Sequence, residues 1–221
     1  MTPVRRKAVL FDLDGTLINS LPDISGCMNA VLERHGLPVH PQDAYRLFIG
    51  NGSRVMAGRA AGNVPAETVE ALYADYCPLY AAHCYDLSYV YDGMRELLAA
   101  LRSDGMRLAV FSNKEDPDVL SMINHYFPAG IFEVIRGHLP HMPLKPDPAG
   151  ALAIAAEMGV DPAECWYLGD IAVDINTCHA AGMELIAVSW GFRSVEELIA
   201  AGAERIVAKP AQALEVIRAE S

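Results

Sequence analysis

The sequence contains no apolar run long enough for a transmembrane helix. Residues 1–7 are basic, but a predicted strand and Asp12 follow at once, in place of the apolar segment of an export signal. No two cysteines have the C-x-x-C spacing of redox or zinc motifs. The odd set of five is typical of free buried thiols in a reducing cytosol: Cys27, Cys77, Cys84, Cys165 and Cys178. We therefore expect a cytoplasmic protein that does not insert into a membrane.

Positive charge is also scarce. The chain has 17 Lys and Arg against 28 Asp and Glu, which gives a formal net charge of −11. Such an acidic protein is repelled by nucleic acids and by anionic membrane surfaces, so we expect neither as a partner. The seven histidines lack the spacing of metal ligands. At 221 residues and 52% hydrophobic composition, the chain is long and apolar enough for a full core, and no segment is low in complexity.

The second half of the chain alternates between strand and helix patterns. Apolar runs typical of strands occur at 7–11, 107–111, 132–135, 166–168, 185–188 and 205–207. Helical patterns follow these strands from 107 onward, near 115–125 and 148–159 for example, with the last one ending near Arg218. This alternation predicts an α/β fold, a doubly wound parallel sheet of the Rossmann-like type.

Residues 18–86 break this alternation, because their pattern is helical and shows no convincing strand. The helical segments are near 22–35, 41–48, 52–61 and 66–83, and prolines and a Gly50-Asn51-Gly52 cluster mark the joints. We predict a core domain formed by 1–17 and 87–221, with an all-helical domain of 18–86 inserted into it.

Two acids follow the first strand, at Asp12 and Asp14. Residues two apart on a strand face the same side, and Gly15 lets the chain turn away sharply. Two carboxylates this close repel each other unless a cation lies between them or one is protonated. The arrangement suits a divalent metal and a nucleophile beside a general acid. The alternative is an ordinary turn, since Asp, Gly and Thr are common loop residues.

Polar residues end two more strands and begin a helix. Ser112-Asn113-Lys114 follows the strand at 107–111, Lys145 precedes the helix at 148–159, and Asp170 and Asp174 follow the strand at 166–168. In open α/β sheets, sites lie outside the carboxyl ends of the strands, where these residues fall. The four motifs, in this order, resemble those of the haloacid dehalogenase-like hydrolases.

The resemblance implies a role for each acidic residue. Asp12 would be a nucleophile that forms an aspartyl-phosphate, and Asp14 would protonate the leaving oxygen and then deprotonate water. Mg²⁺ would be held by Asp12, Asp170 and the backbone carbonyl of Asp14. Asp174 would support the metal's waters and Lys145, or else be a helix-start acid favoured by the dipole. Dehalogenating members lack an acid two residues after the nucleophile, so Asp14 favours phosphoryl transfer.

The other motif residues would contact the phosphate. Ser112 resembles the family's phosphate-binding hydroxyl at a helix start, and the alternative is a simple N-cap serine. Lys145 resembles the cation that offsets charge on Asp12 and the phosphoryl group, although a Lys before Pro is often solvated. Thr16 and Asn113 would be secondary contacts. The resemblance also implies that the helical insert is a mobile cap over the site.

Two positions depart from the family pattern. Ile171 stands where many relatives have Ser or Thr, so one polar contact beside the metal site is absent. Asn19 stands where relatives often have Asp. Neither position belongs to the residues that act on the phosphoryl group, so both bear on substrate and rate more than on reaction type.

Three segments resemble the phosphoglycolate phosphatase group: residues 17–24 (LINSLPDI), 48–52 (FIGNG) and 189–192 (SWGF). We therefore expect Mg²⁺-dependent hydrolysis of a small phosphomonoester such as phosphoglycolate, by a monomer or homodimer. A pyrophosphatase, a nucleotidase, a sugar-phosphate phosphatase or a phosphomutase are alternatives, as is a non-catalytic binding protein. Arg54 of the insert is a candidate for binding a substrate carboxylate, or else a solvent-facing helix residue.

Overall fold

The computed structural model describes residues 6–220, so residues 1–5 and 221 of the predicted core domain lie outside the described residues. Its main sheet has six strands in the order β5-β4-β1-β6-β7-β8. All adjacent pairs are parallel, which confirms the predicted sheet. The bounds are β1 (Ala8–Phe11), β4 (Arg107–Glu115), β5 (Val134–His138), β6 (Cys165–Gly169), β7 (Glu184–Val188) and β8 (Ile206–Val207).

Strand β1 lies in the middle of the sheet and is buried on both faces. Alternate residues point to opposite sides. Val9 and Phe11 pack into one hydrophobic cluster, whereas Ala8 and Leu10 pack into a second one. Four consecutive apolar residues therefore fit a strand that is covered by helices above and below.

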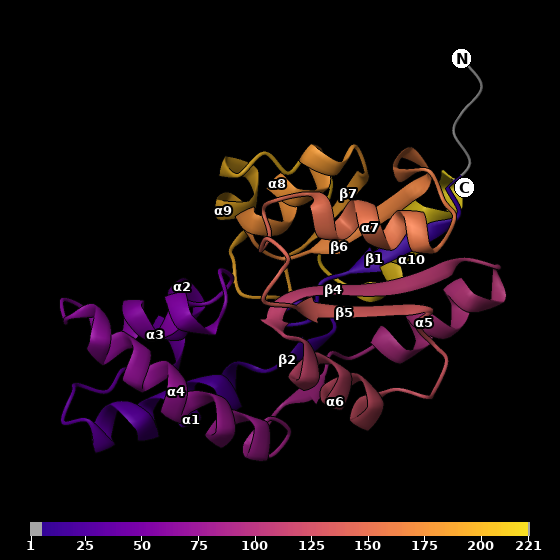
Figure 1. The fold of residues 1–221 in the computed structure, drawn as a ribbon. Helices are drawn as coiled ribbons and strands as arrows, with labels where there is room; N and C mark the ends of the chain where they lie inside the picture. The colour runs from indigo at the N-terminus through magenta and orange to yellow at the C-terminus, as the bar shows by residue number, and fades with distance from the viewer. Residues whose placement is uncertain (1–5, 221) are drawn as a thin grey trace.

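Helices cover both faces of the sheet (Figure 1). On one face lie α5 (Met94–Ser103), α6 (Asp116–Tyr126) and α10 (Pro210–Ala219), whose apolar residues join the cluster of Val9. On the other lie α7 (Ala149–Glu157), α8 (Ala172–Ala181) and α9 (Val195–Ala200), which contribute to the cluster of Leu10. The helix α5 falls in 87–106, where our sequence analysis assigned no element.

The register of β1 aligns the two neighbouring strands with the edge of the sheet at which β1 ends. Phe11, the last residue of β1, pairs with Val110 of β4 on one side and with Leu168 of β6 on the other. The chain order of the strands reverses at β1, and ligands of open α/β sheets bind in the crevice at such a point. The residues that follow Phe11, Val110 and Leu168 thus meet at one edge.

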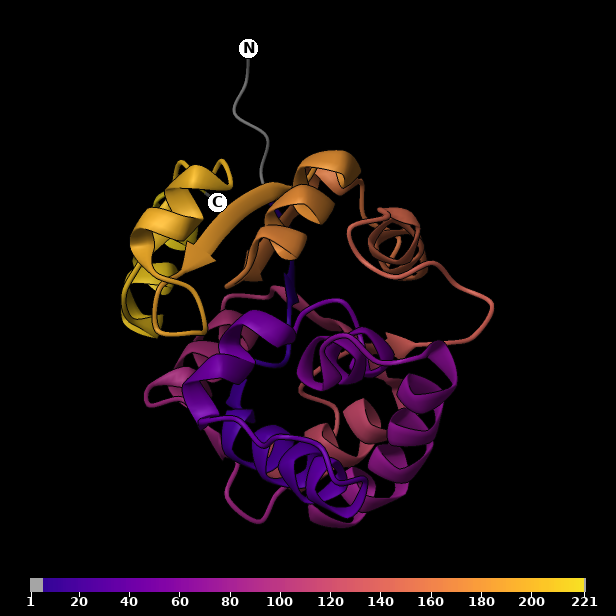
Figure 2. The same ribbon diagram turned by 90° about the vertical axis from the view of Figure 1, so that its left-hand side faces the viewer.

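The helices of the insert lie beyond this edge of the sheet (Figures 1 and 2). They are α1 (Leu21–Arg34), α2 (Tyr45–Phe48), α3 (Ser53–Ala61) and α4 (Ala66–His83), with one 3₁₀ turn at Gln42–Ala44. A second 3₁₀ turn, Pro162–Glu164, precedes β6. The helical segments expected at 22–35, 41–48, 52–61 and 66–83 are present with small shifts at their ends. We call residues 20–86 the cap.

Two short strands that we did not expect join the cap to the core. Ile18–Asn19 (β2) pairs antiparallel with Tyr89–Val90 (β3), and the ribbon lies where the chain leaves and re-enters the core. A strand of two residues is too short to show any periodicity in the sequence. Its pairing depends on a partner far along the chain, which explains why it was missed.

Candidate active site

The loop after β1 brings Asp12 to the carboxyl edge of the sheet. The Asp12 amide donates to the carbonyl oxygen of Leu168 at 2.9 Å, so the backbone stays fixed beyond the last strand residue. Gly15 then turns with φ +91°, and a Cβ there would lie 2.3 Å from Oδ2 of Asp170. Only glycine fits this backbone angle and this close approach. The turn therefore serves the site, because it lets Asp170 come near.

Lys145 is the central cation of the site. Its Nζ lies 2.7 Å from Oδ1 of Asp12 and 2.7 Å from Oδ1 of Asp174, and it also donates to the Phe111 carbonyl at 3.1 Å. Burial alone would lower the pKa of Lys145, but the charges of Asp12 and Asp174 raise it well above its usual value. The buried ammonium therefore stays charged beside Asp12, as the sequence analysis expected.

Three buried carboxylates gather near this lysine: Asp12, Asp170 and Asp174 offer oxygens that lie within 4.8 Å of one another. Burial, together with the charge of Asp174, raises the pKa of Asp12 to about 7. Burial and the charges of Asp12 and Asp174 raise the pKa of Asp170 well above its usual value. The cluster holds more negative charge than Lys145 balances, and its donors are all oxygens, so it fits a hard divalent cation such as Mg²⁺.

Asp170 is oriented by two donors. The amide of Phe192 donates to its Oδ2 at 2.7 Å, and the Thr16 hydroxyl donates to its Oδ1 at 3.3 Å. Thr16 is fully buried. The structure therefore places the Thr16 hydroxyl against the carboxylate of Asp170, a candidate metal ligand. Thr16 is not among the residues that line the cavity described below.

Asp174 has features of both roles that the sequence left open, an acid at a helix start and a partner of Lys145. It lies in the first turn of α8, where its Oδ2 accepts from the amides of Asp170 and Ile171 at 3.2 and 3.3 Å. Its Oδ1 meanwhile contacts Lys145 and accepts from the Tyr167 hydroxyl at 3.3 Å. The Asp174 carboxylate thus accepts hydrogen bonds at the start of α8 and also binds Lys145. Because both of its oxygens are used in this way, Asp12 and Asp170 are the better candidates for metal ligands.

Ser112 corrects one expectation. It does not begin a helix: β4 continues to Glu115, and α6 starts at Asp116. Its hydroxyl accepts from the Lys114 amide at 3.2 Å and lines the cavity described below. The strand runs past the apolar residues because β5 continues beside it, with His138 paired to Glu115. Any phosphate at Ser112 would therefore meet its hydroxyl without the amides of a helix start.

Asn113 connects two loops. Its side chain accepts from the Lys145 amide at 2.7 Å and donates to the Lys145 carbonyl at 3.0 Å. The same amide group donates to the carbonyl of Gly50 in the cap at 2.9 Å. Asn113 therefore holds the backbone of Lys145 and one point of the cap, and these bonds already use its amide.

Lys114 is a site residue that the sequence analysis did not assign. Its side chain is 5% exposed and its Nζ forms an ion pair with Oδ1 of Asp14. It also donates to the hydroxyl of Tyr80, on α4 of the cap, at 2.7 Å. Ser112 and Lys114 both line the cavity described below, on a part of β4 where the pairing with β5 shifts register. The signal in the sequence is the place of Lys114 directly after an apolar strand run, at the sheet edge where sites of open α/β sheets lie.

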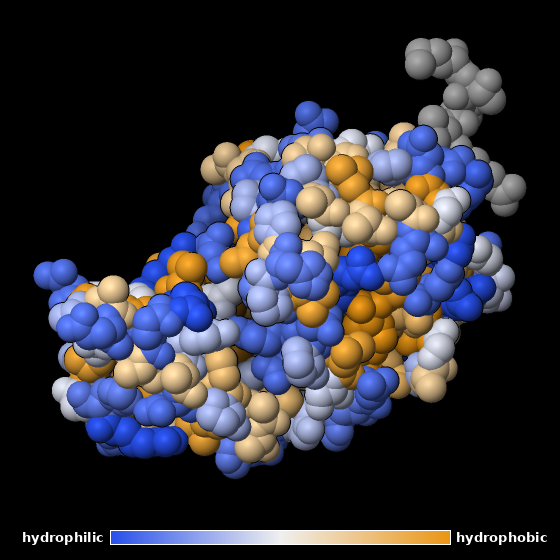
Figure 3. Space-filling model, viewed as in Figure 1, coloured by the Kyte–Doolittle hydropathy of each residue, from blue (hydrophilic) through white to orange (hydrophobic). Residues whose placement is uncertain are grey.

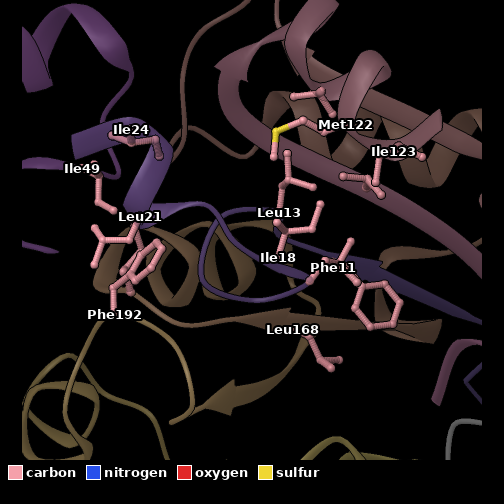
Figure 4. Close-up of a cluster of buried hydrophobic side chains, with 14 of the residues drawn as sticks. Phe11, Leu13, Ile18, Leu21, Ile24, Ile49, Met122, Ile123, Leu168 and Phe192 are labelled. Atoms are coloured by element: carbon pink, nitrogen blue, oxygen red, sulfur yellow. The ribbon is translucent and has the colours of Figure 1, made fainter. Parts of the chain in front are cut away.

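A cavity that opens to solvent lies between these residues and the cap, and the space free of atoms in it, its open part included, is about 520 Å³. Asp12, Asp14 and Lys145 lie on its core side, and its cap side is mostly apolar, formed by Ile24, Ile49, Met56 and Tyr76. Figure 4 shows Ile49 and Leu21 beside Phe192, where the cap meets the core loop after β7. In Figure 3 the outline dips between the cap lobe and the core lobe. A concave site with apolar side chains and a few polar groups is typical of sites for small organic molecules.

Arg54 is not among the residues that line this cavity. Its guanidinium pairs with Glu70 and lies over the Tyr73 ring, 4.4 Å from the ring centroid. The side chain is 53% exposed. The structure thus places Arg54 on a solvated face of the cap, so its contact with a substrate carboxylate stays a prediction that this arrangement does not favour.

The two departures from the family pattern lie at the junction of cap and core. Ile171 is buried, lines the cavity and faces Gly50, where an added Cβ would lie 2.5 Å from its Cδ1. Asn19 donates to the Tyr89 hydroxyl at 2.9 Å and accepts from the Leu21 amide at 3.3 Å. Ile171 therefore makes an apolar contact with the cap loop at Gly50. A Ser or Thr at position 171 would face the same cap loop with a hydroxyl.

Comparison with known proteins identifies the family. Residues 9–188 match the model of the haloacid dehalogenase-like hydrolases. N-acetylmuramic acid 6-phosphate phosphatase of Pseudomonas aeruginosa is 33% identical over 98% of this chain and 97% of its own length. Phosphoglycolate phosphatase of Pseudomonas putida is 32% identical over 84% of this chain and 70% of its own.

Solved structures of similar proteins have the same fold. A predicted phosphoglycolate phosphatase from Haemophilus somnus superimposes with a TM-score of 0.87 at 27% identity, covering 96% of this chain and 97% of that one. Among residues 6–220, no helix is both long and apolar enough to span a bilayer. The family match covers the acidic loop of Asp12 and Asp14 as well as Lys145 and Asp170, and the structure brings these residues together at one sheet edge. The chain belongs to the haloacid dehalogenase-like hydrolases and is a phosphatase of that family.

Proposed function

We propose that this phosphatase is Mg²⁺-dependent and hydrolyses a small phosphomonoester through an aspartyl-phosphate on Asp12. The observation that carries the proposal is the hydrogen bonding of the Asp12 carboxylate, which lines the core side of the cavity. Lys145 holds its Oδ1, and within residues 6–220 no hydrogen bond is found to its Oδ2. A buried carboxylate with one oxygen fixed and the other unoccupied is well suited to attack phosphorus.

In the first step, an Asp12 oxygen attacks phosphorus and the bond from phosphorus to the ester oxygen breaks. The Asp14 carboxyl gives its proton to the departing oxygen, so an alcohol leaves and an acyl phosphate remains. In the second step, Asp14 takes a proton from water as that water attacks phosphorus. Inorganic phosphate leaves and the Asp12 carboxylate is restored.

The remaining groups balance charge. Lys145 and the Ser112 hydroxyl line the cavity beside Asp12, where they can bind oxygens of the phosphoryl group. Mg²⁺, held by Asp12, Asp170 and the carbonyl of Asp14, would supply the positive charge that offsets a phosphate dianion next to these acids. The raised pKa values of Asp12 and Asp170 support a cation at this place, because both acids are buried without enough positive charge.

Phosphoglycolate is the first candidate substrate, because relatives such as the Pseudomonas putida enzyme carry that name. Its carboxylate is one carbon from the ester oxygen, so it would lie inside the cavity. Two lysines line the cavity, Lys114 and Lys145, and both are already paired with aspartates. A substrate carboxylate would therefore depend on backbone amides, such as those of the turn at Gly50–Gly52.

A phosphorylated sugar is the second candidate, and the cap side of the cavity favours it. Ile24, Ile49 and Met56 can pack against a sugar ring, and the Tyr76 hydroxyl, for which no partner is found among the described residues, offers it a hydrogen bond. The Pseudomonas aeruginosa relative acts, by its name, on N-acetylmuramic acid 6-phosphate. A carboxylate on such a sugar is remote from the phosphate and can stay near solvent.

The proposal includes a cytoplasmic location and a small phosphorylated metabolite as the only partner besides the metal, with the protein a monomer or homodimer. The cysteine chemistry supports the location, because all five cysteines are free thiols.

The test is a screen of phosphorylated metabolites with Mg²⁺, with Ca²⁺ and with a chelator. We expect phosphate release with Mg²⁺ and at least a 1,000-fold loss (roughly) in chelator, because the metal stabilises the transition state by several kcal/mol. Ca²⁺ should not restore activity, since its longer bonds misplace the nucleophile. Undiminished turnover in chelator would overturn the proposal. The kcat/KM values for phosphoglycolate and N-acetylmuramic acid 6-phosphate decide between the two candidates.

A further inference from the structure

Asp14 is held by two donors that share one of its oxygens. The Lys114 ammonium and the Ser20 hydroxyl both donate to Oδ1. In residues 6–220, no hydrogen bond to Oδ2 is found, and the carboxylate lines the cavity. A carboxyl group that transfers protons needs one oxygen directed at the reacting atoms and a fixed orientation. The arrangement around Oδ1 meets both needs.

Lys114 is itself held in place. Its Nζ donates to the Tyr80 hydroxyl at 2.7 Å and lies 3.5 Å from the sulfur of Met122. Tyr80 is buried on α4 and stacks on Tyr76, with ring centroids 5.4 Å apart. The ammonium therefore cannot swing away from Asp14 without breaking bonds to a cap helix and leaving a buried charge unpaired.

The proposed phosphatase chemistry leaves this lysine without a task. Lys145, and not Lys114, contacts the nucleophile, and the two ammonium groups are paired with different aspartates. A buried lysine without a role costs stability, because desolvation of its charge is only partly offset by its ion pair with Asp14 and by the charge of Asp118 nearby. Its burial beside the acid of the site is therefore explained best by a role in orienting that acid.

We propose that Lys114 is the positioning residue of the general acid: held by Tyr80 of the cap, it fixes Oδ1 of Asp14 and so directs Oδ2 at the leaving oxygen. This inference rests on the proposed function. Lys114 acts through Asp14 and not on the phosphoryl group. Its importance should consequently depend on how much the departing oxygen needs a proton.

The experiment compares an alkyl phosphate with p-nitrophenyl phosphate, whose leaving group departs as a stable anion. For Lys114→Met we expect kcat/KM for the alkyl ester to fall at least 30-fold (roughly). For the aryl ester we expect kcat/KM to fall by less than about threefold relative to an exposed-lysine control. This follows from the typical contribution of 10²–10⁴ by general acids. The control is Lys209→Met, which replaces an exposed lysine, and it should leave both values unchanged.

A double substitution tests the route of action. If Lys114 works through Asp14, Asp14→Asn with Lys114→Met should be no slower on the alkyl ester than Asp14→Asn alone. Multiplied losses would overturn the proposal. Tyr80→Phe removes only the hydroxyl that holds the ammonium, so it keeps the proposal testable if Lys114→Met does not fold. It should lower the ratio of alkyl to aryl kcat/KM by about threefold, a typical loss for one hydrogen bond.

The outcomes separate this inference from the proposed function. A wild-type protein that hydrolyses neither ester in Mg²⁺ would overturn both. A wild-type protein that hydrolyses both, with Lys114→Met and Tyr80→Phe each leaving the alkyl-to-aryl ratio unchanged, would overturn the positioning role alone. Equal losses on both esters mean that Lys114 supports the fold or binds phosphate, and they also contradict the proposal.

Discussion

The two sides of the cavity are built in opposite ways. On the core side, Asp12, Asp170, Asp174 and Lys145 are buried and joined to one another or to the sheet by hydrogen bonds. The cap side presents aliphatic carbons and few polar groups. A few bonds hold the cap to the core, among them those from Ser53 and Tyr73 to Glu115, at 2.8 and 3.2 Å.

This difference divides the work of the enzyme. Charged groups must be oriented in advance to act on phosphorus, and a rigid parallel sheet provides that orientation. Apolar contacts are not directional, so the cap can vary without disturbing the reacting groups. We therefore expect changes in the core to affect every substrate and changes in the cap to affect some substrates more than others.

The strongest test of the core is Asp12→Asn. It replaces the proposed nucleophile with a group of nearly the same shape, so the fold should persist while turnover of all phosphoesters falls at least 10⁴-fold (roughly), as for other nucleophile substitutions. Circular dichroism checks the fold and phosphate release measures turnover. A variant that keeps a tenth of normal activity would show that another residue attacks phosphorus.

Lys145→Met tests how the core is held together. The substitution leaves Asp12 and Asp174 without their shared cation, and breaking a buried ion pair in this way costs about 3–5 kcal/mol of unfolding free energy. Urea denaturation in chelator measures it. Addition of Mg²⁺ should recover part of the loss if the metal binds the same acids. A loss under 1 kcal/mol (roughly) would contradict the coupling of these groups.

Gly50→Ala tests the junction of the two sides. Gly50 has φ +114°, and an added Cβ would lie 2.5 Å from Cδ1 of Ile171. The strained backbone costs about 1–2 kcal/mol, so we expect KM to rise about tenfold while kcat changes little. The paired variant Gly50→Ala with Ile171→Ala removes the clash but not the strain, and it should recover part of the KM. A fall in kcat alone would place Gly50 in the chemistry.

The smallest expected effect is that of Arg54→Ala. Because the guanidinium pairs with Glu70 on an exposed face, we expect less than a twofold change in KM (roughly) for phosphoglycolate and for an uncharged aryl phosphate. Glu70→Ala is the matched control and should behave in the same way. A rise in KM of about tenfold for phosphoglycolate alone, the size of one charge-assisted hydrogen bond, would instead show that Arg54 binds the carboxylate.

Some of this arrangement was predictable from the sequence. A fully apolar segment followed by Asp12 predicts a buried strand with a site at its end. Parallel pairing of this strand with β6 brings Asp170 to the same edge of the sheet. The helices of the cap were also predictable, because amphipathic patterns extend over several turns. These features depend on local pattern and on one general rule of topology.

The remainder depends on contacts between distant residues. The true end of β4 is set by β5 and not by its own residues, so Ser112 and Lys114 were not recognised as strand positions. The pairing of Lys114 with Asp14 and the bond to Tyr80 join three separate segments. Arg54 was proposed to bind substrate because it follows a glycine turn, but in the structure it pairs with Glu70 on an exposed face of the cap. No motif in the sequence indicates this ion pair.

The position of β1 in the sheet also bears on biosynthesis. The strand that presents Asp12, the proposed nucleophile, is made before both of its neighbours, because Ala8 pairs with Arg107 and with Cys165. Contacts this distant in sequence form slowly, and the N-terminal part of a chain emerges before its partners exist. A ribosome-bound chain that has released only β1 and the cap therefore lacks Lys145 and Asp170. Phosphatase activity must wait until β6 has emerged and closed the second side of β1.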